Sequence, residues 1–522
     1  MKLINRAVNF FGRRQFIAYW VIAIAALALF TYLLADPTFA DPDSFYHAKM
    51  AQFLAQKGAI TEFPWLFFTT LHYNFIDHHF LYHLVLVPFV TIFPPLIGLK
   101  VATVIFASLT ILFIFWFLRQ QKVKGAFWYV LFLLTVNPFI FRLALPKSQP
   151  LVLLFLFLFL YFLLSRKYLG LIIISSLYVW LYAGWPLALG LASIYVAINW
   201  FWSKQQRGWL FLRRLKIGKI KAARQNFWLL SSVILGTAAG LFFSPYFPKN
   251  FYFYWQQSFK IAILNYQYAI GVGAEWYPYQ IGDLLLGALP FFIFLAFAIF
   301  IFICFYKRQP MNTWFFAVSA FIFLALTLKS RRYVEYFIPL AFCFSVLSLN
   351  SAAAEIKNFL AIIFSKRLLP VLPALLLLIL SPVFYLDLQK IKDFYQNSFS
   401  FTKFAEASSW LKQHSSPGDI VFHSDWDEFP ILFYNNDKNY YIVGLDPTFM
   451  YDYDKDLYGR WRDITLGRYS GEIYPTIKNL FAARYVFVDF NQNAEFDRNL
   501  ASNFYFKKVF SDSEARIYQV AE

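Results

Sequence analysis

The chain has 522 residues, of which 60% are hydrophobic, 22% are aromatic and only 15% carry a charge. Soluble domains are about 25% charged, so this composition excludes an ordinary soluble protein and indicates an integral membrane protein. The net charge of +18 does not indicate nucleic-acid binding, because eight of the Lys and Arg residues lie in one segment, 204–224, that contains no acidic residue. Such a segment between two apolar stretches is typical of a cytoplasmic loop.

Apolar stretches long enough to cross the hydrocarbon core, which is ~30 Å thick, recur up to residue 386. Basic residues precede the first stretch, 16–35, which predicts a retained first helix with the N-terminus in the cytoplasm. We expect about eleven transmembrane helices, the other ten near residues 101–118, 125–141, 149–164, 168–185, 186–202, 227–244, 284–305, 311–328, 333–350 and 368–386. The apolar stretch 81–97 contains Pro94 and Pro95, and we expect it to lie along the outer surface.

The end of the chain, residues 387–522, is charged and rich in turn signals, as in a soluble domain. Its patterns predict a helix at 405–414, short strands at 420–422, 440–443 and 485–488, and a short helix at 477–483. This alternation indicates a small α/β domain. The predicted fold is a polytopic α-helical protein of the cell membrane, with a transmembrane domain at 1–386. Its large first outer loop, 36–100, and its C-terminal α/β domain, 387–522, are expected to be extracytoplasmic.

Ionisable residues are concentrated in the predicted outer loops. Seven of the nine acidic residues before residue 387 lie in two of these loops, and five of the seven histidines lie in the first loop: His47, His72, His78, His79 and His83. Ionisable groups are costly close to a bilayer and usually mark function. The first outer loop is therefore the leading candidate for a functional site.

The first cluster in this loop consists of Asp41, Asp43 and His47. If a helix begins at Asp43, His47 lies one turn further along the same face. A carboxylate and an imidazole in that geometry can bind a divalent cation, Mg²⁺ or Mn²⁺, or act as a general base. The alternative is that Asp41 or Asp43 simply caps the helix.

The second cluster is Asp77-His78-His79, with His83 one turn beyond His79. Because it lies in the same loop as the first cluster, Asp77 and His79 join Asp41, Asp43 and His47 as candidate metal ligands. The alternative is that the two histidines spaced by one turn only line the membrane interface.

Glu275 lies in a second outer loop that is rich in aromatic residues. Its apolar neighbours predict that desolvation raises its pKa, as suits a catalytic carboxyl group; the alternative is an ordinary surface carboxylate. Further on, Lys329, Arg331 and Arg332 place positive charge at the predicted outer end of a span, against the usual topology rule. The planar fork of an arginine binds phosphate well, so Arg331 and Arg332 are candidates for binding a lipid-linked phosphate; the alternative is anchoring to lipid headgroups.

These features, in this order, resemble the catalytic subunits of oligosaccharyltransferases, within the wider GT-C membrane glycosyltransferases. The motif Asp43-Ser44-Phe45-Tyr46-His47 is similar to the acidic start of that family's first outer loop, and Glu275 resembles the glutamate of its TIxE element. The segment from Arg331 to Pro339 resembles the family's Arg-Arg-Phe-x-Glu-Tyr-x-x-Pro segment, whose arginine is associated with the donor pyrophosphate. Trp426 and Asp427 fall where the family has its acceptor-reading WWDYG motif.

The chain departs from the family pattern at two places. Where the family has an acidic pair at the outer start of its fourth span, this chain has Arg142-Leu143-Ala144-Leu145-Pro146-Lys147-Ser148-Gln149, so half of the implied metal site is missing unless Asp77, His78 or His79 replaces it. Of WWDYG only Trp426 and Asp427 are present. This second departure puts recognition of an Asn-x-Ser/Thr acceptor in question.

The resemblance implies a membrane glycosyltransferase that moves a glycan from a polyprenyl phosphate or pyrophosphate carrier to an extracytoplasmic acceptor, with inversion. Asp43 and Glu275 would be catalytic, Arg331 and Arg332 would bind the donor phosphate, and Trp426 and Asp427 would bind a protein, lipid or glycan acceptor. One alternative is a monosaccharide transferase, for example a mannosyltransferase, acting on a lipid or glycan. An alternative of another class is a transporter or flippase, which would place ionisable residues inside its spans.

Overall fold

The computed structural model describes residues 2–205, 215–264, 266–365 and 368–522. Within the predicted basic loop 204–224, residues 206–214 lie outside the described residues. The chain forms two compact units, each assembled from three separated segments. The helical unit consists of Met1–Asp36, Ala102–Leu241 and Glu275–Asn397, and the mixed unit consists of Pro37–Val101, Phe242–Ala274 and Ser398–Glu522.

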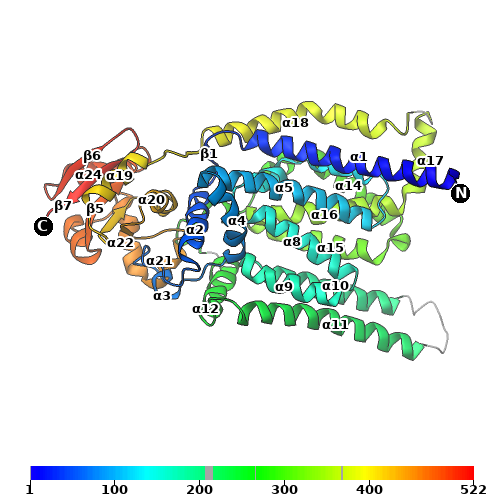
Figure 1. The fold of residues 1–522 in the computed structure, drawn as a ribbon, viewed down its shortest axis with the longest axis horizontal. Coiled ribbons are helices and arrows are strands. Elements are labelled where there is room, and N and C mark those ends of the chain that lie inside the picture. Colours follow the sequence, from blue (N-terminus) through cyan, green and yellow to red (C-terminus); the bar gives the residue numbers. More distant parts are fainter. Residues whose placement is uncertain (1, 206–214, 265, 366–367) are drawn as a thin grey trace. The chain divides into compact units, whose positions relative to one another are not determined.

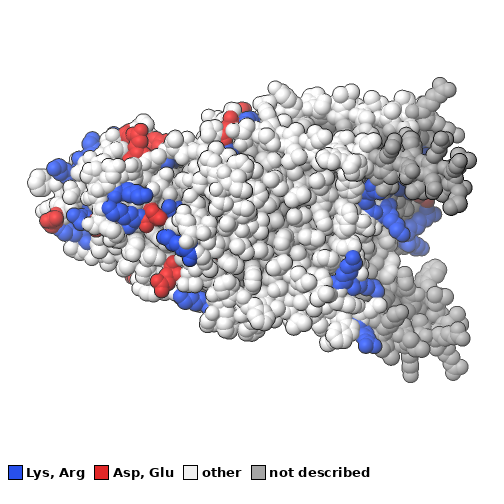
Figure 2. All heavy atoms as spheres, in the orientation of Figure 1, with Lys and Arg blue, Asp and Glu red and all other residues white. Residues whose placement is uncertain are grey.

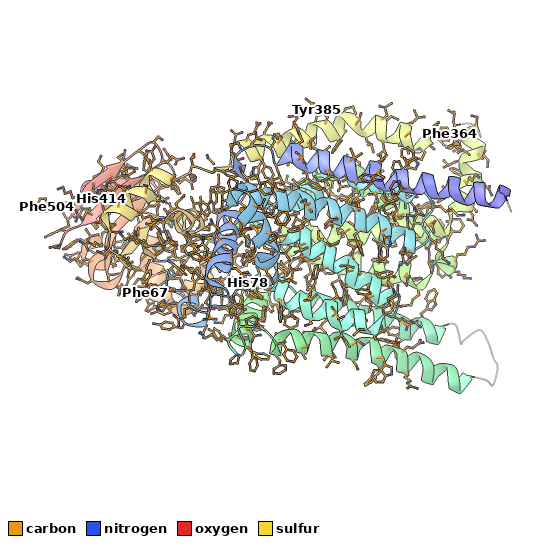
Figure 3. All side chains as sticks on the ribbon, viewed as in Figure 1. Phe67, His78, Phe364, Tyr385, His414 and Phe504 are labelled. Carbon is orange, nitrogen blue, oxygen red and sulfur yellow. The ribbon has the colours of Figure 1, made fainter. Side chains whose placement is uncertain are left out.

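Six helices of the described chain have an apolar segment long enough to cross a membrane. They are α1 (Lys2–Leu33), α5 (Pro95–Gln120), α11 (Leu215–Phe242), α15 (Met311–Lys329), α16 (Val334–Ser351) and α18 (Leu372–Gln396). Figure 1 shows α1 and α18 side by side, and they are in contact. Side chains on α18 such as Tyr385, which is 59% exposed, extend outward (Figure 3). These helices confirm an integral membrane protein.

Two of the expected spans are broken. Helices α6 (Ala126–Leu133) and α7 (Asn137–Ala144) are bent by 73°, and α13 (Ile281–Gly287) and α14 (Leu289–Cys304) by 91°. Both α7 and α14 have a proline in their first turn, Pro138 and Pro290, where proline favours starting a new helix over continuing one. If each pair is one span, the described residues contain eight candidates, so the expected number of eleven is not established.

Shorter apolar helices occupy further expected spans. They are α8 (Gln149–Leu164), α9 (Tyr168–Leu181) and α10 (Pro186–Gln205). Helix α4 (Phe80–Ile92) covers the stretch expected to lie along the surface; its 13 residues give a length of about 20 Å, too short for a hydrocarbon core. The remaining short helices up to the end of the helical unit are α12 (Lys249–Trp255), η1 (Gln256–Leu264), η2 (Ala274–Trp276), η3 (Tyr306–Arg308), η4 (Arg331–Tyr333) and α17 (Ala353–Ile363).

Helix α16 lies at the centre of the helical unit. In the segment Arg331–Ser351, 89% of the most apolar window is buried, and α16 packs against α15, α14 and α7. Every side chain from Val334 to Leu349 is buried, including Glu335 in the first turn and the two serines Ser345 and Ser348. A helix that is buried all round is expected at the core of a membrane protein, so this packing fixes the positions of η4 and of the first turn of α16.

The mixed unit contains a five-stranded sheet in the order β4 (Tyr440–Tyr441), β3 (Ile420–His423), β5 (Ala483–Val488), β7 (Arg516–Val520), β6 (Phe506–Ser511). Strand β3 is parallel to β4 and β5, whereas β7 is antiparallel to β5 and β6. The other helices of this region are α19 (Ala405–His414), η5 (Trp426–Glu428), α20 (Phe429–Asn435), α21 (Thr448–Tyr453), α22 (Lys455–Thr465), α23 (Ile473–Pro475), η6 (Thr476–Leu480) and α24 (Ala494–Ala501). The predicted helix 405–414 and all three predicted strands are confirmed.

The first loop is built into the mixed unit by backbone hydrogen bonds. Strand β1 (Thr38–Phe39) pairs with β2 (Phe399–Ser400), and Tyr441 of β4 exchanges backbone bonds with residues 65 and 67, of 2.7 and 3.2 Å. Helix α2 (Asp43–Lys57) packs against α4 and α20. Charges of both signs cover the sheet region in Figure 2, whereas few lie over the middle of the long helices. The predicted boundary at residue 387 falls within α18, and the division into domains stays a prediction.

Candidate functional site

Helix α2 begins at Asp43, which is the condition under which His47 lies one turn along the same face. The backbone N–H of Asp43 donates to Oδ1 of Asp41 over 2.9 Å, so the Asp41 carboxylate satisfies one of the free donors at the helix start. The role of Asp41, as a helix cap or as a metal ligand, stays a prediction. The carboxylate of Asp43 lies in the first turn, where the helix dipole favours a negative charge.

His47, one turn after Asp43, belongs to a buried hydrogen-bonded chain with residues of the second cluster. Its Nδ1 lies 2.8 Å from Nε2 of His83, and Nδ1 of His83 lies 2.6 Å from Oδ2 of Asp77. Asp77 also accepts from the backbone N–H of His79 over 3.0 Å. All four side chains are at most 8% exposed.

These two hydrogen bonds fix the tautomers of the His47 and His83 imidazoles when both rings are neutral. Ionised Asp77 only accepts, so His83 carries its proton on Nδ1 and its Nε2 accepts from His47. His47 then carries its proton on Nδ1, and its Nε2 is the unprotonated ring nitrogen. We call Asp77, His83 and His47 the histidine relay; Figure 3 labels the neighbouring His78.

Among the residues that the structure describes, no group of three or more His, Cys, Asp or Glu side chains is arranged to hold a metal ion. In the relay, Nδ1 of His47, both ring nitrogens of His83 and Oδ2 of Asp77 are engaged with one another. The assignment of Asp41, Asp43, His47, Asp77 and His79 as metal ligands stays a prediction.

Asp427 lies in a second group of acidic residues in the mixed unit. Burial, with repulsion from Asp425, Glu428, Asp41 and Asp43, raises the pKa of Asp427 to about 8. The mixed unit therefore brings the predicted catalytic carboxylate Asp43 within electrostatic range of the predicted acceptor residue Asp427. These two residues are far apart in the sequence.

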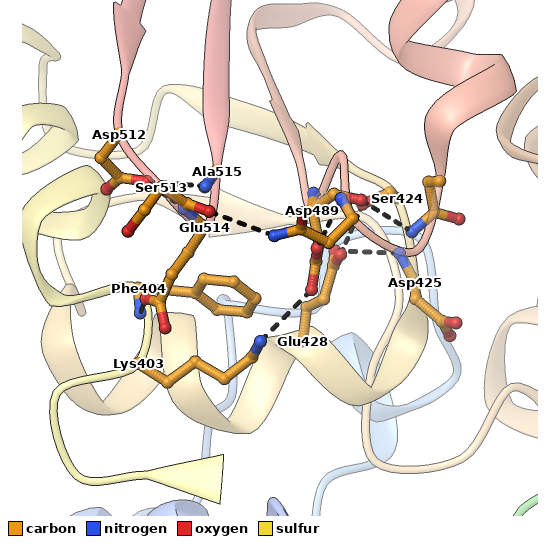
Figure 4. A network of polar contacts seen from close by, with 12 residues as sticks. Lys403, Phe404, Ser424, Asp425, Glu428, Asp489, Asp512, Ser513, Glu514 and Ala515 are labelled. Atoms are coloured by element: carbon orange, nitrogen blue, oxygen red, sulfur yellow. Dashed lines mark hydrogen bonds and ion pairs between the residues drawn. The ribbon is translucent and has the colours of Figure 1, made fainter.

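Hydrogen bonds around η5 hold this acidic group in place (Figure 4). The backbone N–H of Asp425 donates to Oε2 of Glu428 over 2.9 Å, and the N–H of Trp426 donates to Oδ1 of Asp425 over 2.7 Å, which makes a capping box. Ser424 donates to Glu428, and Lys403 forms an ion pair of 3.3 Å with Asp489. Asp427 is thus carried on a rigid turn.

In the helical unit, Glu275 lies in a network of ion pairs that we call the Arg142 cluster, comprising Arg142, Glu275, Arg332, Glu335 and Tyr182. Arg142 Nη1 lies 2.8 Å from Glu275 Oε2, and Arg142 Nε and Nη2 lie 2.8 and 2.6 Å from Glu335 Oε2. Arg332 Nη1 lies 2.9 Å from Glu275 Oε1. Both oxygens of Glu275 are therefore occupied by guanidinium groups.

The prediction that the pKa of Glu275 is raised is wrong. Burial disfavours its ionised form, but the guanidinium groups of Arg332 and Arg142, together with the Lys147 ammonium, hold the pKa of Glu275 well below its usual range. Opposite charges at hydrogen-bond distance outweigh the desolvation. Glu275 is consequently ionised and is not a reservoir for a proton.

The two candidate phosphate-binding arginines have different surroundings. Arg332 donates from Nε and Nη2 to the Tyr182 hydroxyl over 3.1 and 2.9 Å, and its guanidinium lies over the Trp276 ring. Arg331 donates from Nε to the carbonyl of Pro278 over 3.2 Å and lies over the Tyr279 ring. No carboxylate pairs with Arg331 in the described part of the chain. The terminal nitrogens of Arg331 are therefore better placed than those of Arg332 to bind an added anion.

Sequence reasoning missed Arg142, Tyr182 and Glu335 as members of one site. The run 142–149 stood out only as a departure from the family pattern, although a buried arginine before a polar run is itself a signal that carboxylates lie near it. The partners of Arg142 are 133 and 193 residues away. No local spacing could have identified them.

Solved structures with the same fold were found, although no family model and no curated protein sequence matches the chain. The oligosaccharyltransferase AglB of Archaeoglobus fulgidus, solved with an inhibitory peptide and a dolichol-phosphate, superimposes with a TM-score of 0.65 and 13% identity, over 97% of this chain and 74% of that one. Another structure of that enzyme is a complex with Zn and sulfate.

Two further structures extend the comparison. ArnT of Cupriavidus metallidurans, bound to undecaprenyl phosphate, gives a TM-score of 0.56 and 12% identity over 95% of this chain and 97% of that one. The arabinofuranosyltransferase AftD from mycobacteria gives a TM-score of 0.55 and 13% identity, over 97% of this chain and 40% of that one. AglB, ArnT and AftD are all members of the GT-C superfamily. The chain therefore has the fold of the GT-C membrane glycosyltransferases.

Proposed function

We propose that this chain is a GT-C glycosyltransferase that moves a glycan from a polyprenyl phosphate or pyrophosphate carrier to an acceptor on the extracytoplasmic side, as oligosaccharyltransferases do. The observation that carries the proposal is Arg331, which finds no carboxylate partner among the residues that the structure describes and lies just after the end of α15. A carrier phosphate occupies this depth, because its polyprenyl chain lies in the hydrocarbon and its sugar in water. The basic segments that flank the spans support a cytoplasmic N-terminus.

The proposed step is a direct displacement with inversion. The acceptor nucleophile forms a bond to the anomeric carbon while the bond from that carbon to the carrier phosphate oxygen breaks, and the carrier phosphate leaves with the electron pair. Asp43 accepts the proton of the acceptor. Arg331 stabilises the charge on the departing phosphate through paired N–H···O bonds. Trp426 and Asp427 are proposed to contact the acceptor.

A monosaccharide transferase is the second candidate. ArnT and this chain cover each other almost completely, at 97% and 95%, whereas the chain covers 74% of AglB. The incomplete acceptor motif, with only Trp426 and Asp427 of five positions, also favours an acceptor other than a peptide.

Purified protein in vesicles with lipid-linked sugars extracted from cells tests the proposal. A glycosylated product that forms with the wild type and not with Asp43→Asn supports a transferase, and its mass distinguishes one sugar from a larger glycan. Movement of the labelled donor across the vesicle membrane without any product would instead identify a flippase.

A further inference from the structure

The Arg142 cluster places a guanidinium where the family resemblance implies a metal ion. That resemblance predicts acidic residues at the outer start of a span together with Glu275, but the run 142–149 contains Arg142 and Lys147 and no acidic residue. Arg142 lies between Glu275 and Glu335, and its contacts to them are 2.6 to 2.8 Å. The side chain of Glu335 is 1% exposed and that of Arg142 is 8% exposed.

The donor set at Glu275 does not suit a divalent cation. Oε2 of Glu275 accepts from Arg142 and Oε1 accepts from Arg332, so neither oxygen is available without breaking a partly buried ion pair. A cation that reached Glu275 would also lie next to two guanidinium groups and close to Lys147, which interacts electrostatically with the same carboxylate. Like charges repel strongly in a poorly solvated site.

We infer that Arg142 is a built-in cation that takes the place of a divalent ion at Glu275. It supplies positive charge to this end of the helical unit, keeps Glu275 ionised, and does so permanently, because a guanidinium neither dissociates nor loses its proton in a protein. Arg142 is a positioning residue in this scheme. The inference rests on the proposed function for its catalytic meaning, but the ligand state of Glu275 can be tested on its own.

Binding of Mn²⁺ measured by electron paramagnetic resonance on the purified full-length protein provides the test. Glu275→Gln is compared with the wild type and with Glu355→Gln, a control that removes another glutamate paired with an arginine, the more exposed Arg308. We expect all three proteins to bind the same amount of Mn²⁺ with the same affinity. A loss of one bound Mn²⁺, or a tenfold weaker affinity, in Glu275→Gln alone would overturn the inference.

Arg142→Ala provides the opposite test, because it frees Oε2 of the buried Glu335 and Oε2 of the partly buried Glu275, while Arg332 stays on Oε1 of Glu275. We expect this variant to gain Mn²⁺ binding and a rise of several degrees in melting temperature with 1 mM Mn²⁺, neither of which the wild type shows. A folded variant that gains neither would contradict the inference. If the variant does not fold, the Glu275→Gln comparison decides.

The activity readout separates this inference from the proposed function. If the chain transfers sugar, we expect the wild type to have the same transfer rate in EDTA and in Mn²⁺. The contrary result is a transfer rate that falls tenfold or more in EDTA and recovers with Mn²⁺, in the wild type but not in Glu275→Gln. That result would count against a built-in cation. If no transfer is detected under any condition, the proposed function fails while the Mn²⁺ measurements still determine the ligand state of Glu275.

Discussion

The two polar regions of this molecule bury their charges in different ways. The Arg142 cluster of the helical unit pairs guanidinium groups with carboxylates. Burial disfavours the ionised form of Glu275, but Arg332 and Arg142 hold the pKa of Glu275 well below its usual range. The mixed unit instead places acidic groups near one another, and burial together with these acidic neighbours raises the pKa of Asp427 to about 8. Opposite charges therefore keep Glu275 ionised, whereas burial among like charges makes the ionisation of Asp427 depend on pH near 8.

The largest effect is expected from breaking the fixed-charge region. Arg142→Met leaves Glu275 and Glu335 without their shared cation, and removal of one partner of a buried ion pair costs about 3–5 kcal/mol. Thermal unfolding in detergent should show this loss, whereas Arg308→Met, which breaks an exposed pair with Glu355, should cost less than ~1 kcal/mol. Equal melting temperatures for Arg142→Met and the wild type would show that the cluster does not hold the helical unit together.

Asp43→Asn tests the mixed unit by removing the proposed proton acceptor with little change in volume. We expect transfer to fall on the order of a hundredfold or more, while the melting temperature stays within a few degrees of the wild type. Asp41→Ala is the comparison variant, because it removes the oxygen that accepts from the backbone N–H of Asp43, and it should affect stability more than rate. Near-normal transfer by Asp43→Asn would leave Asp43 without a catalytic role.

Lysine substitutions at the two adjacent arginines test which one binds the donor. Arg331→Lys keeps the charge but loses the planar fork, so we expect weaker use of the donor by ~1–3 kcal/mol. The effect should appear as a raised donor KM, with the KM for the acceptor little changed. Arg332→Lys should lower thermal stability in addition, because it loses contacts to Glu275 and Tyr182. A normal donor KM for both variants would remove the support for a phosphate site here.

The smallest expected effect concerns pH. The pKa of Asp427 in the folded protein is about 8, whereas an ordinary aspartate has a pKa of ~4. Between these two pH values, the folded state therefore binds the carboxyl proton of Asp427 more tightly than the unfolded state does. The stability linked to Asp427 is therefore fully present below pH ~4 and is lost as pH rises through about 8. Asp427→Asn should thus match the wild type most closely below pH ~4 and become more stable than the wild type as pH rises, by at least ~1.4 kcal/mol above pH 8, the equivalent of one pKa unit.

Melting temperatures of the two proteins at pH 5, 6.5 and 8.5 measure this difference. Glu495→Gln, at an exposed carboxylate paired with Arg498, is the control and should show no comparable pH dependence. A gap between wild type and Asp427→Asn that stays constant with pH would show that Asp427 titrates normally.

Much of the fold could be predicted because the local pattern of apolar and polar residues indicates whether a segment is surrounded by lipid, by water or by the protein core. Apolar stretches longer than a bilayer core predicted the long helices, and charge and alternation predicted the helix at Ala405–His414 and the strands β3, β4 and β5. The hairpin of β6 and β7 was missed, because exposed lysines interrupt the apolar pattern of β6.

What the sequence by itself determined is the membrane class, the helix positions and the order of the motifs around Asp43, Glu275, Arg331 and Trp426. Only the tertiary structure decided that Glu275 is bound by two guanidinium groups, that His83 connects Asp77 to His47, and that Asp43 lies within electrostatic range of Asp427. The physical reason is that periodicity and composition reflect the average surroundings of a segment. The ionisation and partners of a side chain depend instead on which distant residues packing brings to within a few ångströms of it.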